Sequence, residues 1–324
     1  MIIHRGSDHE SFLVRLPQSE IESYSRLTML HYCKTNNFGD DLNLWLWSRM
    51  APEFLNSRDD RLFLGIGTIL SSKVPTGLPK FVFGSGWAGE RKFKIDSSWN
   101  LFGVRGPLTA SGLGLEKKMV VSDPGLLVRK YFDSGRMKRR GIGWMPHHRS
   151  ANAVDWGTVC LRYGIRFIDP RESVDKVLQE ISSCELVVSE AMHGAIISDA
   201  LRVPWIPVRM YSHINEFKWK DWCASLGLTY LPLRLPPLFQ DRPPKSKMIA
   251  NRWKRWLAPS PLGKPKWKLL PVRSSSEAEI DRTLKAILTA STRKKPVLSN
   301  PDRLNQMEET QINRLEVARK VWNQ

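Results

Sequence analysis

The chain has 324 residues, of which 41% are hydrophobic, and it carries a formal net charge of +18 at pH 7. That length suits two domains, and the composition excludes both a disordered chain and one built of membrane spans, because its apolar stretches are short or interrupted by charged residues. The excess of positive charge favours an anionic partner: nucleic acid, an anionic membrane surface or a phosphorylated substrate.

From about Thr28 to Gly227 the chain alternates short apolar runs with amphipathic stretches. The first set of predicted strands lies at 28–33, 61–67, 80–86 and 100–106, and the last three end in turns that contain glycine. After the charged linker 134–141 the pattern restarts. The second set of predicted strands lies at 141–146, 165–170, 184–189 and 205–210.

A helix is predicted over 172–183, where apolar residues recur at helical spacing. Strands that alternate with helices indicate parallel sheets covered on both faces. We therefore predict an α/β protein with two doubly wound, Rossmann-like domains that face a cleft, residues 1–137 and 138–235. In such sheets ligands bind at the carboxyl ends of the strands, so the turns after the apolar runs are the place to look for chemistry.

Residues 236–324 form a basic tail with predicted helices, rich in proline and tryptophan in its first part. Between 243 and 268, Ile249, Trp253, Trp256 and Leu257 can share one helical face, which basic residues mostly surround. This pattern is typical of a helix that lies on anionic lipid, but it fits equally a helix that packs its tryptophans onto the protein. A second amphipathic helix is predicted over 276–290, docked on the first domain. Residues 292–324 fit either another helix or a frayed end.

The N-terminus and the cysteines indicate the compartment. The first ten residues, MIIHRGSDHE, have charges where a signal peptide has its apolar centre, so we expect no export. Cys33, Cys160, Cys184 and Cys223 are scattered and form no CxxC pair. We therefore expect buried, reduced thiols in a cytoplasmic protein, with neither a disulfide framework nor a zinc site.

Seven motifs follow one another along the chain, most of them at predicted strand ends. They are NNFGDDLN (36–43), LGIGTIL (64–70), FGSG (83–86), VRGPLTA (104–110), SDPGLLV (122–128), SEAMHGAIISDALRVPWIPV (189–208) and INEFKWKDWCASLGL (214–228). In this order the set resembles the polysaccharide pyruvyl transferase family, most closely the ketal-forming enzymes of rhizobial exopolysaccharide synthesis. The resemblance implies an architecture like that of GT-B glycosyltransferases, with phosphoenolpyruvate, the donor, bound in the interdomain cleft. The first domain would form the acceptor side and the second the donor side.

The activity that the resemblance implies is transfer of a pyruvyl group from phosphoenolpyruvate to a sugar of an exopolysaccharide repeat unit, as a cyclic ketal. Acceptors in this family are typically lipid-linked oligosaccharides at the cytoplasmic face of the membrane. We therefore expect a cytoplasmic protein, peripheral at the inner face of the plasma membrane, that contacts anionic lipid. We expect no cofactor, no metal and no specific nucleic acid.

Two other interpretations stay open. A GT-B glycosyltransferase that uses a nucleotide sugar would have the same architecture, although the second domain lacks a glutamate-rich turn for a nucleotide ribose. A non-catalytic protein that binds an anionic polymer would account for the charge, but it leaves the strand-end motifs unexplained.

Three residues on these motifs are candidates for binding the phosphate and carboxylate of the donor. Arg105 follows a predicted strand and precedes a helix, so its guanidinium fork and the helix N–H groups can hold an anion; it can instead pair with an acid across the cleft. His193 lies in a turn that resembles the family's donor-binding turn, although Ala191 stands where the family often has arginine. Lys218 can neutralise the phosphate, or it can be solvated like Lys220. We expect Arg105→Ala to weaken donor binding and leave the fold intact.

The acid and base of the reaction are assigned to two residues. His193 is a candidate proton donor, and Asp40 is the predicted base for the attacking sugar hydroxyl. Alternatively, Asp40 or Asp41 caps a helix that begins near Leu42.

The other candidates lie in strand-end turns. Gly67, Thr68 and Ser85 are predicted to let substrate approach the backbone, in turns that match neither a GxGxxG nor a GxxxxGK[ST] motif, so we expect no dinucleotide and no P-loop nucleotide there. His147 either reaches the phosphate or forms a surface pair with His148.

Two carboxylates complete the set of strand-end residues. Glu190 precedes the histidine turn and is predicted to face the cleft and bind substrate. Asp123, in SDPG, is predicted to be a structural turn residue.

Overall fold

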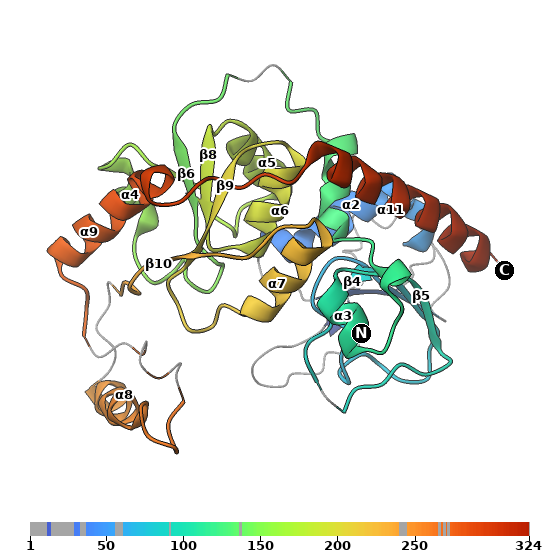
Figure 1. Cartoon of the computed structure of the whole chain (residues 1–324), viewed down its shortest axis with the longest axis horizontal. Helices are drawn as coiled ribbons and strands as arrows, with labels where there is room; N and C mark the ends of the chain where they lie inside the picture. The colour runs from blue at the N-terminus through green and yellow to red at the C-terminus, as the bar shows by residue number, and fades with distance from the viewer. Residues whose placement is uncertain are drawn as a thin grey trace, which may run out of the picture.

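The computed structural model describes residues 37–55, 61–90, 92–135, 138–239, 245–264, 267, 270 and 273–323, together with the backbone of the strands at 12–13 and 29–32. The described strands form two five-stranded sheets, with helices against them (Figure 1). The N-terminal segment MIIHRGSDHE and Cys33 lie outside the described residues. The prediction of an α/β fold with parallel sheets is confirmed.

The first sheet has the order β1-β2-β3-β4-β5, in which only β1 is antiparallel to its neighbour. Its strands are β1 (Phe12–Leu13), β2 (Met29–Tyr32), β3 (Leu62–Leu64), β4 (Lys80–Ser85) and β5 (Trp99–Val104). Helix α2 (Phe38–Met50) joins β2 to β3 and covers one face, where Trp47 packs edge-on against Phe63 and Phe83. Alternate residues such as Leu62 and Leu64 belong to a separate cluster on the other face, as the period of a strand requires.

The second sheet is parallel throughout, in the order β10-β9-β8-β6-β7. Its strands are β6 (Ile142–Met145), β7 (Arg166–Phe167), β8 (Leu186–Ser189), β9 (Trp205–Arg209) and β10 (Leu233–Arg234). From β6 the chain passes to β7 on one side and then returns to β8 on the other. This reversal, between β6 and β8, is the topological switch point at which doubly wound sheets bind ligands.

Helices cover both faces of the second sheet. Helices α5 (Val174–Ser182) and α6 (Met192–Ala200) contribute to one apolar cluster, and α4 (Trp156–Leu161) and α9 (Glu277–Leu288) to another. The helix predicted over 276–290 is therefore confirmed, but its predicted dock on the first domain is wrong. Ile280 and Leu284 of α9 join the cluster that contains Trp144 of β6, because that face of the second sheet offers the apolar surface they need.

The two sheets share a core. One cluster contains α2 and β4 residues of the first sheet together with α5 and α6 residues of the second. Three connecting elements also meet at this boundary: α3 (Pro107–Gly112), the 3-10 helix η3 (Pro124–Lys130) and α7 (Glu216–Ser225). The segments that follow β2, β5, β8 and β9 are therefore held against one another.

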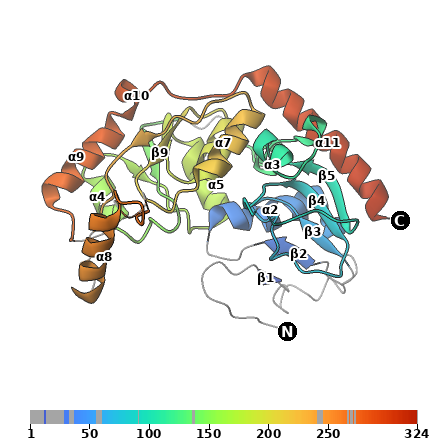
Figure 2. The ribbon, with the colours of Figure 1, turned by 60° about the horizontal axis from the view of Figure 1, so that its bottom comes forward.

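Helix α11 (Pro301–Trp322) returns the chain to the first sheet (Figure 2). Asn300 caps it by accepting a hydrogen bond from the N–H of Asp302 at 2.7 Å, and Trp322 packs edge-on against Phe81 with ring centroids 4.5 Å apart. Of the two interpretations of 292–324, the additional helix is correct. The remaining described helices are α8 (Lys245–Leu257), α10 (Ala290–Arg293) and the 3-10 turns η1 (Pro52–Phe54) and η2 (Lys117–Met119).

Two general properties concern membrane-spanning helices and the reactivity of the cysteines. Within the described ranges no helix is both long and apolar enough to cross a membrane. Cys160, Cys184 and Cys223 are buried free thiols, and burial raises the pKa of each, to about 12, 11 and 12 respectively. These three thiols are therefore protonated and unreactive at neutral pH.

Candidate active site

His193 connects the two sheets. It is the second residue of α6, directly after β8, and its ring lies against the backbone of Gly39 in the first turn of α2. A Cβ atom at Gly39 would fall 2.0 Å from His193 Nδ1, so only glycine allows this approach. The packing of α2 against α6 thus brings the helix N-termini of two motifs together.

Asp123 lies on the other side of the same imidazole. Its Oδ2 is 3.7 Å from His193 Nε2, and its Oδ1 accepts a hydrogen bond of 2.9 Å from the N–H of Gly125. Burial raises the pKa of Asp123, but the neighbouring His193 and Arg105 outweigh it, so the net shift is downward. Asp123 is therefore an anion at neutral pH, placed to stabilise a protonated His193.

Arg105 occupies a second contact between the sheets. Its side chain is fully buried at the carboxyl end of β5, and its Nε donates to Asp221 Oδ2 of α7 at 3.2 Å. Its Nη1 donates to Thr68 Oγ1 at 2.8 Å, whereas Nη2 has no hydrogen-bond partner among the described residues. The acid across the cleft that the sequence left open is thus Asp221, which also accepts from the N–H and Oγ1 of Thr109.

The glycine turns after β3 and β4 support this arginine. A Cβ atom at Gly86 would fall 2.2 Å from Arg105 Nη2, so the guanidinium lies directly on the backbone of that turn. The N–H of Gly86 donates to the carbonyl of Gly67 at 2.8 Å. Ser85, predicted to bind substrate, is buried, and its hydroxyl donates to the carbonyls of Leu64 and Gly65. Ser85 thus links the carboxyl ends of β3 and β4.

Asp40 lies in the first turn of α2, beside Gly39. The helix begins at Phe38 with Asn37 as its N-cap residue, so the prediction that Asp40 or Asp41 caps a helix starting near Leu42 is wrong. Both carboxylates lie inside the first turn instead, where the helix dipole favours negative charge. Asn37 Nδ2 donates to Asp40 Oδ2 at 2.7 Å and orients this carboxylate.

A group of histidines lies where β6 and β9 end, at the switch point of the second sheet. The ring of His147 is 4.3 Å from that of His148 and 5.0 Å from that of His213, centroid to centroid. Burial lowers the pKa of His147 well below its ordinary value, and the nearby charge of Lys218 lowers it further. Lys218 is half-buried in the first turn of α7, whereas Lys220 is exposed and its Nζ lies 3.6 Å from Glu216 Oε2.

Glu190, predicted to face the cleft, is buried beneath this group. Its Oε1 accepts from the N–H groups of Met210 and Tyr211, and its Oε2 accepts from Ser150 Oγ at 2.6 Å. Ser150 Oγ is in turn 3.1 Å from His213 Nε2. This position makes Glu190 a support that fixes the loops after β6 and β9.

The same group predicts how stability depends on pH. Burial, followed by the charges of Arg149 and Lys218, lowers the pKa of His213 from 6.5 to about 4. Between pH 6.5 and 4 the unfolded chain binds a proton at this histidine and the folded protein does not, so stability falls as the pH falls through this window. We expect His213→Gln to remove about 2 kcal/mol of the loss of stability between pH 7 and 4.5, less than the full shift because the ring is partly exposed.

Urea unfolding of the wild type and of His213→Gln at both pH values measures this difference. Equal losses of stability in the two proteins would show that His213 does not carry the effect.

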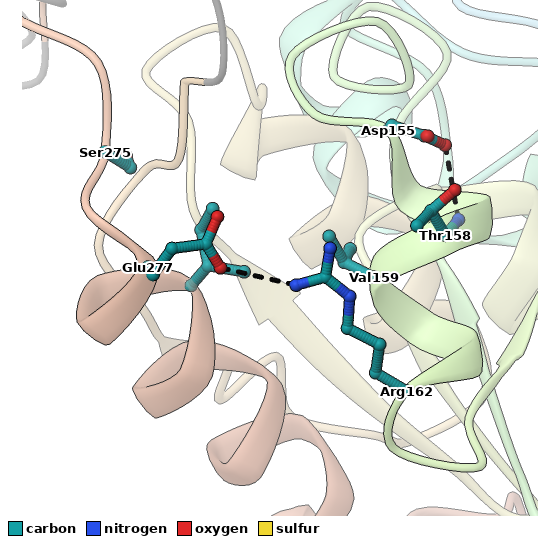
Figure 3. A pocket seen from close by; sticks show the side chains of 7 residues that line it. Asp155, Thr158, Val159, Arg162, Ser275 and Glu277 are labelled. Carbon is teal, nitrogen blue, oxygen red and sulfur yellow. Dashed lines mark hydrogen bonds and ion pairs between the residues drawn. The ribbon is translucent and has the colours of Figure 1, made fainter.

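A separate pocket between α4 and α9 contains none of the candidate residues (Figure 3). In it Arg162 Nη1 is 3.3 Å from Glu277 Oε2, and Asp155 accepts a hydrogen bond from the N–H of Thr158 at 3.2 Å. Over the part of the chain that the structure describes, no group of three or more histidine, cysteine, aspartate and glutamate side chains could hold a metal ion.

The fold and the site together define an α/β protein whose cationic groups and histidine–aspartate pair lie at strand ends, an arrangement suited to binding a small anion and moving a proton. The chain belongs to the polysaccharide pyruvyl transferase family, which matches residues 34–212. The resemblance found in the sequence is thereby confirmed. Asp40, Arg105, Asp123 and His193 fall within the matched region, and Lys218 lies just beyond it.

One relative is the succinoglycan biosynthesis protein ExoV of Rhizobium meliloti (strain 1021). It is 41% identical over 204 residues, which are 62% of this chain and 65% of that protein, slightly less than two thirds of its length. No solved structure matches the chain significantly.

Proposed function

We propose that the protein transfers the pyruvyl group of phosphoenolpyruvate to a sugar of a polysaccharide repeat unit, carried on a lipid-linked oligosaccharide, and forms a cyclic ketal. The observation that carries this proposal is the position of α7. Its Asp221 pairs with Arg105 of the first sheet, and the charge of its half-buried Lys218 acts on His147, which follows β6 of the second. One short helix thus carries one cation and holds another at the boundary of the two sheets, which suits a small donor with a phosphate and a carboxylate.

In this proposal the anionic groups of the donor are bound by Lys218, His147 and Arg105. A buried N–H group without a partner costs about 1–3 kcal/mol, and Arg105 Nη2 is such a group until an acceptor reaches it. Because Arg105 is fully buried, the donor can reach Nη2 only if α7 and the turn after β4 separate slightly. This movement fits a GT-B-like architecture, in which two domains close on a ligand, and we propose that architecture for the chain.

The proton chemistry is assigned to His193 and Asp40. The negative charge of Asp123 Oδ2 lies 3.7 Å from Nε2 and favours the imidazolium, so we assign delivery of a proton to the methylene carbon of the enol to Nδ1. The adjacent carbon becomes electrophilic, a sugar hydroxyl adds to it, and its proton passes to Asp40. Phosphate then leaves, and a second hydroxyl of the same sugar adds to the same carbon and closes the ring, while its proton returns to Nδ1 of His193.

The proposal is tested by calorimetric titration with phosphoenolpyruvate and, separately, with a uridine diphosphate sugar. We expect saturable binding of phosphoenolpyruvate alone. Lys218→Ala should weaken it about 10- to 100-fold, as expected for loss of a charge-assisted hydrogen bond. Lys220→Ala, on the same helix but exposed, is the matched control and should bind normally.

Two other results would contradict all or part of this proposal. Binding of the nucleotide sugar alone would favour a GT-B glycosyltransferase and overturn the proposal. Equal affinities of the two lysine variants would instead remove Lys218 from the donor site.

A further inference from the structure

Helix α8 exposes the side of its surface that a packed helix would bury. Ile249, Trp253 and Trp256 are 58%, 61% and 70% exposed. At about 100° per residue they lie within an arc of roughly 60°. Asn251 and Ala258, on the opposite side, are only 4% and 6% exposed. Of the two interpretations of this segment, the one that packs the tryptophans onto the body of the protein is wrong.

Basic side chains lie around the rest of the helix. At about 100° per residue, exposed Arg252 borders the apolar face, about 70° from its centre, and exposed Lys254 and Arg255 lie about 130° from it on either side. Exposed Lys247 lies toward the side of Asn251 and Ala258. The sequence of α8, KSKMIANRWKRWL, contains no acidic residue. The rings of Trp253 and Trp256 meet edge to face with centroids 5.8 Å apart, so they form one continuous surface.

The position of α8 leaves this face free of the strand-end site. Figures 1 and 2 both show α8 beyond the end of the molecule where α4 and α9 lie, at the opposite end from the C-terminus of α11. Another exposed apolar side chain, Leu262, follows α8 at 83% exposure.

We propose that α8 docks on an anionic lipid surface, with Ile249, Trp253 and Trp256 in the interface. Tryptophan favours the boundary between headgroups and acyl chains, and flanking lysines and arginines favour anionic headgroups.

Two other occupants fit less well. A second copy of the chain would place its own α8 cations against these, at a cost in repulsion. A single-stranded nucleic acid is held by cations that follow its backbone alongside stacked aromatics, whereas here an aliphatic and two indole side chains form one apolar strip and the cations lie outside it. The structure therefore favours lipid.

The test is co-sedimentation of the full chain with phosphatidylcholine vesicles, with and without phosphatidylglycerol. We expect binding only to the anionic vesicles, and less of it as salt is raised. Trp253→Ala combined with Trp256→Ala should lower the affinity at least about tenfold, and Arg252→Ala with Arg255→Ala about fivefold for each charge removed. Leu161→Ala, which removes an 80% exposed apolar side chain from α4, is the matched control and should bind like the wild type.

Other results would overturn the inference. Unchanged vesicle binding by the double tryptophan variant would do so. A tryptophan-dependent dimer in sedimentation without lipid would assign the face to a second copy, and salt-sensitive RNA binding lost in the same variant would assign it to nucleic acid. Because α8 lies apart from the strand ends, the variant should titrate with phosphoenolpyruvate as the wild type does, so failure here is distinguishable from failure of the proposed donor.

Discussion

Replacement of His193 by glutamine should lower the rate of pyruvyl transfer by about 100- to 10,000-fold and leave the fold intact. The imidazole lies between Gly39 of α2 and Asp123 before η3, and glutamine can occupy much of that space but cannot hold an exchangeable proton near neutral pH. Steady-state turnover with phosphoenolpyruvate and a soluble acceptor sugar measures the loss, and the thermal midpoint checks the fold.

Asp123→Asn tests whether Asp123 acts on the reaction through His193 or only supports the fold. Asparagine can still accept the hydrogen bond from the N–H of Gly125, but it removes the negative charge 3.7 Å from His193 Nε2. The protonated imidazole then loses its partner, so the alkaline limb of the pH–rate profile should move to lower pH. An unmoved profile would limit Asp123 to a structural role, and normal turnover in His193→Gln would remove His193 from the reaction.

Eight of the ten described strands could be predicted from the sequence because they lie in short apolar runs, whereas β1 and β10, of two residues each, were not predicted. Residues 80–86, for example, contain β4, with Gly84 inside it and Gly86 directly after it. The order of the strands within each sheet could not be predicted, because the pairing of β8 with β6 depends on contacts between residues far apart in the chain. The position of α9 was predicted wrongly for the same reason. Its apolar stripe indicates that one face is buried, but not against which sheet.

The site was predictable to the extent that its residues lie on motifs. Arg105, His193 and Lys218 all occupy such positions, but their partners come from other segments through tertiary packing. Asp221 was inside a recognised motif, FKWKDW, yet nothing local showed that it would meet Arg105 across 116 residues. His213 lay in no motif that we interpreted, and only the fold places it beside His147.

The start of α2 could have been predicted from the sequence. Asn37 is a residue type that favours helix N-caps, and it stands directly before the first residue of α2. Reading the helix from Asn37 would have placed Asp40 and Asp41 in the first turn. It would also have shown that Gly39 lies inside the helix, where glycine needs a reason such as the approach of His193.

Replacement of Arg105 by alanine should lower the free energy of unfolding by about 3–5 kcal/mol, because it leaves Asp221 buried and without its counter-charge. This expected loss differs from the prediction drawn from the sequence, in which Arg105→Ala leaves the fold intact. Arg105 also holds Thr68 Oγ1 and lies on Gly86, so its loss opens the contact between the sheets. Urea unfolding measures the change, and Arg273→Ala, which breaks an exposed pair with Glu279, should show little.

A double-mutant cycle with Asp221→Asn shows whether the loss belongs to the ion pair. If it does, Arg105→Ala combined with Asp221→Asn should be more stable than the sum of the single changes predicts, because no unpaired charge remains buried. Arg105→Lys keeps the charge but not the fork that reaches both Asp221 and Thr68, so phosphoenolpyruvate binding should fall more than stability does. Strictly additive losses in the cycle would mean that Arg105 supports the fold through packing alone, and unchanged donor binding by Arg105→Lys would place the anion entirely on the side of Lys218 and His147.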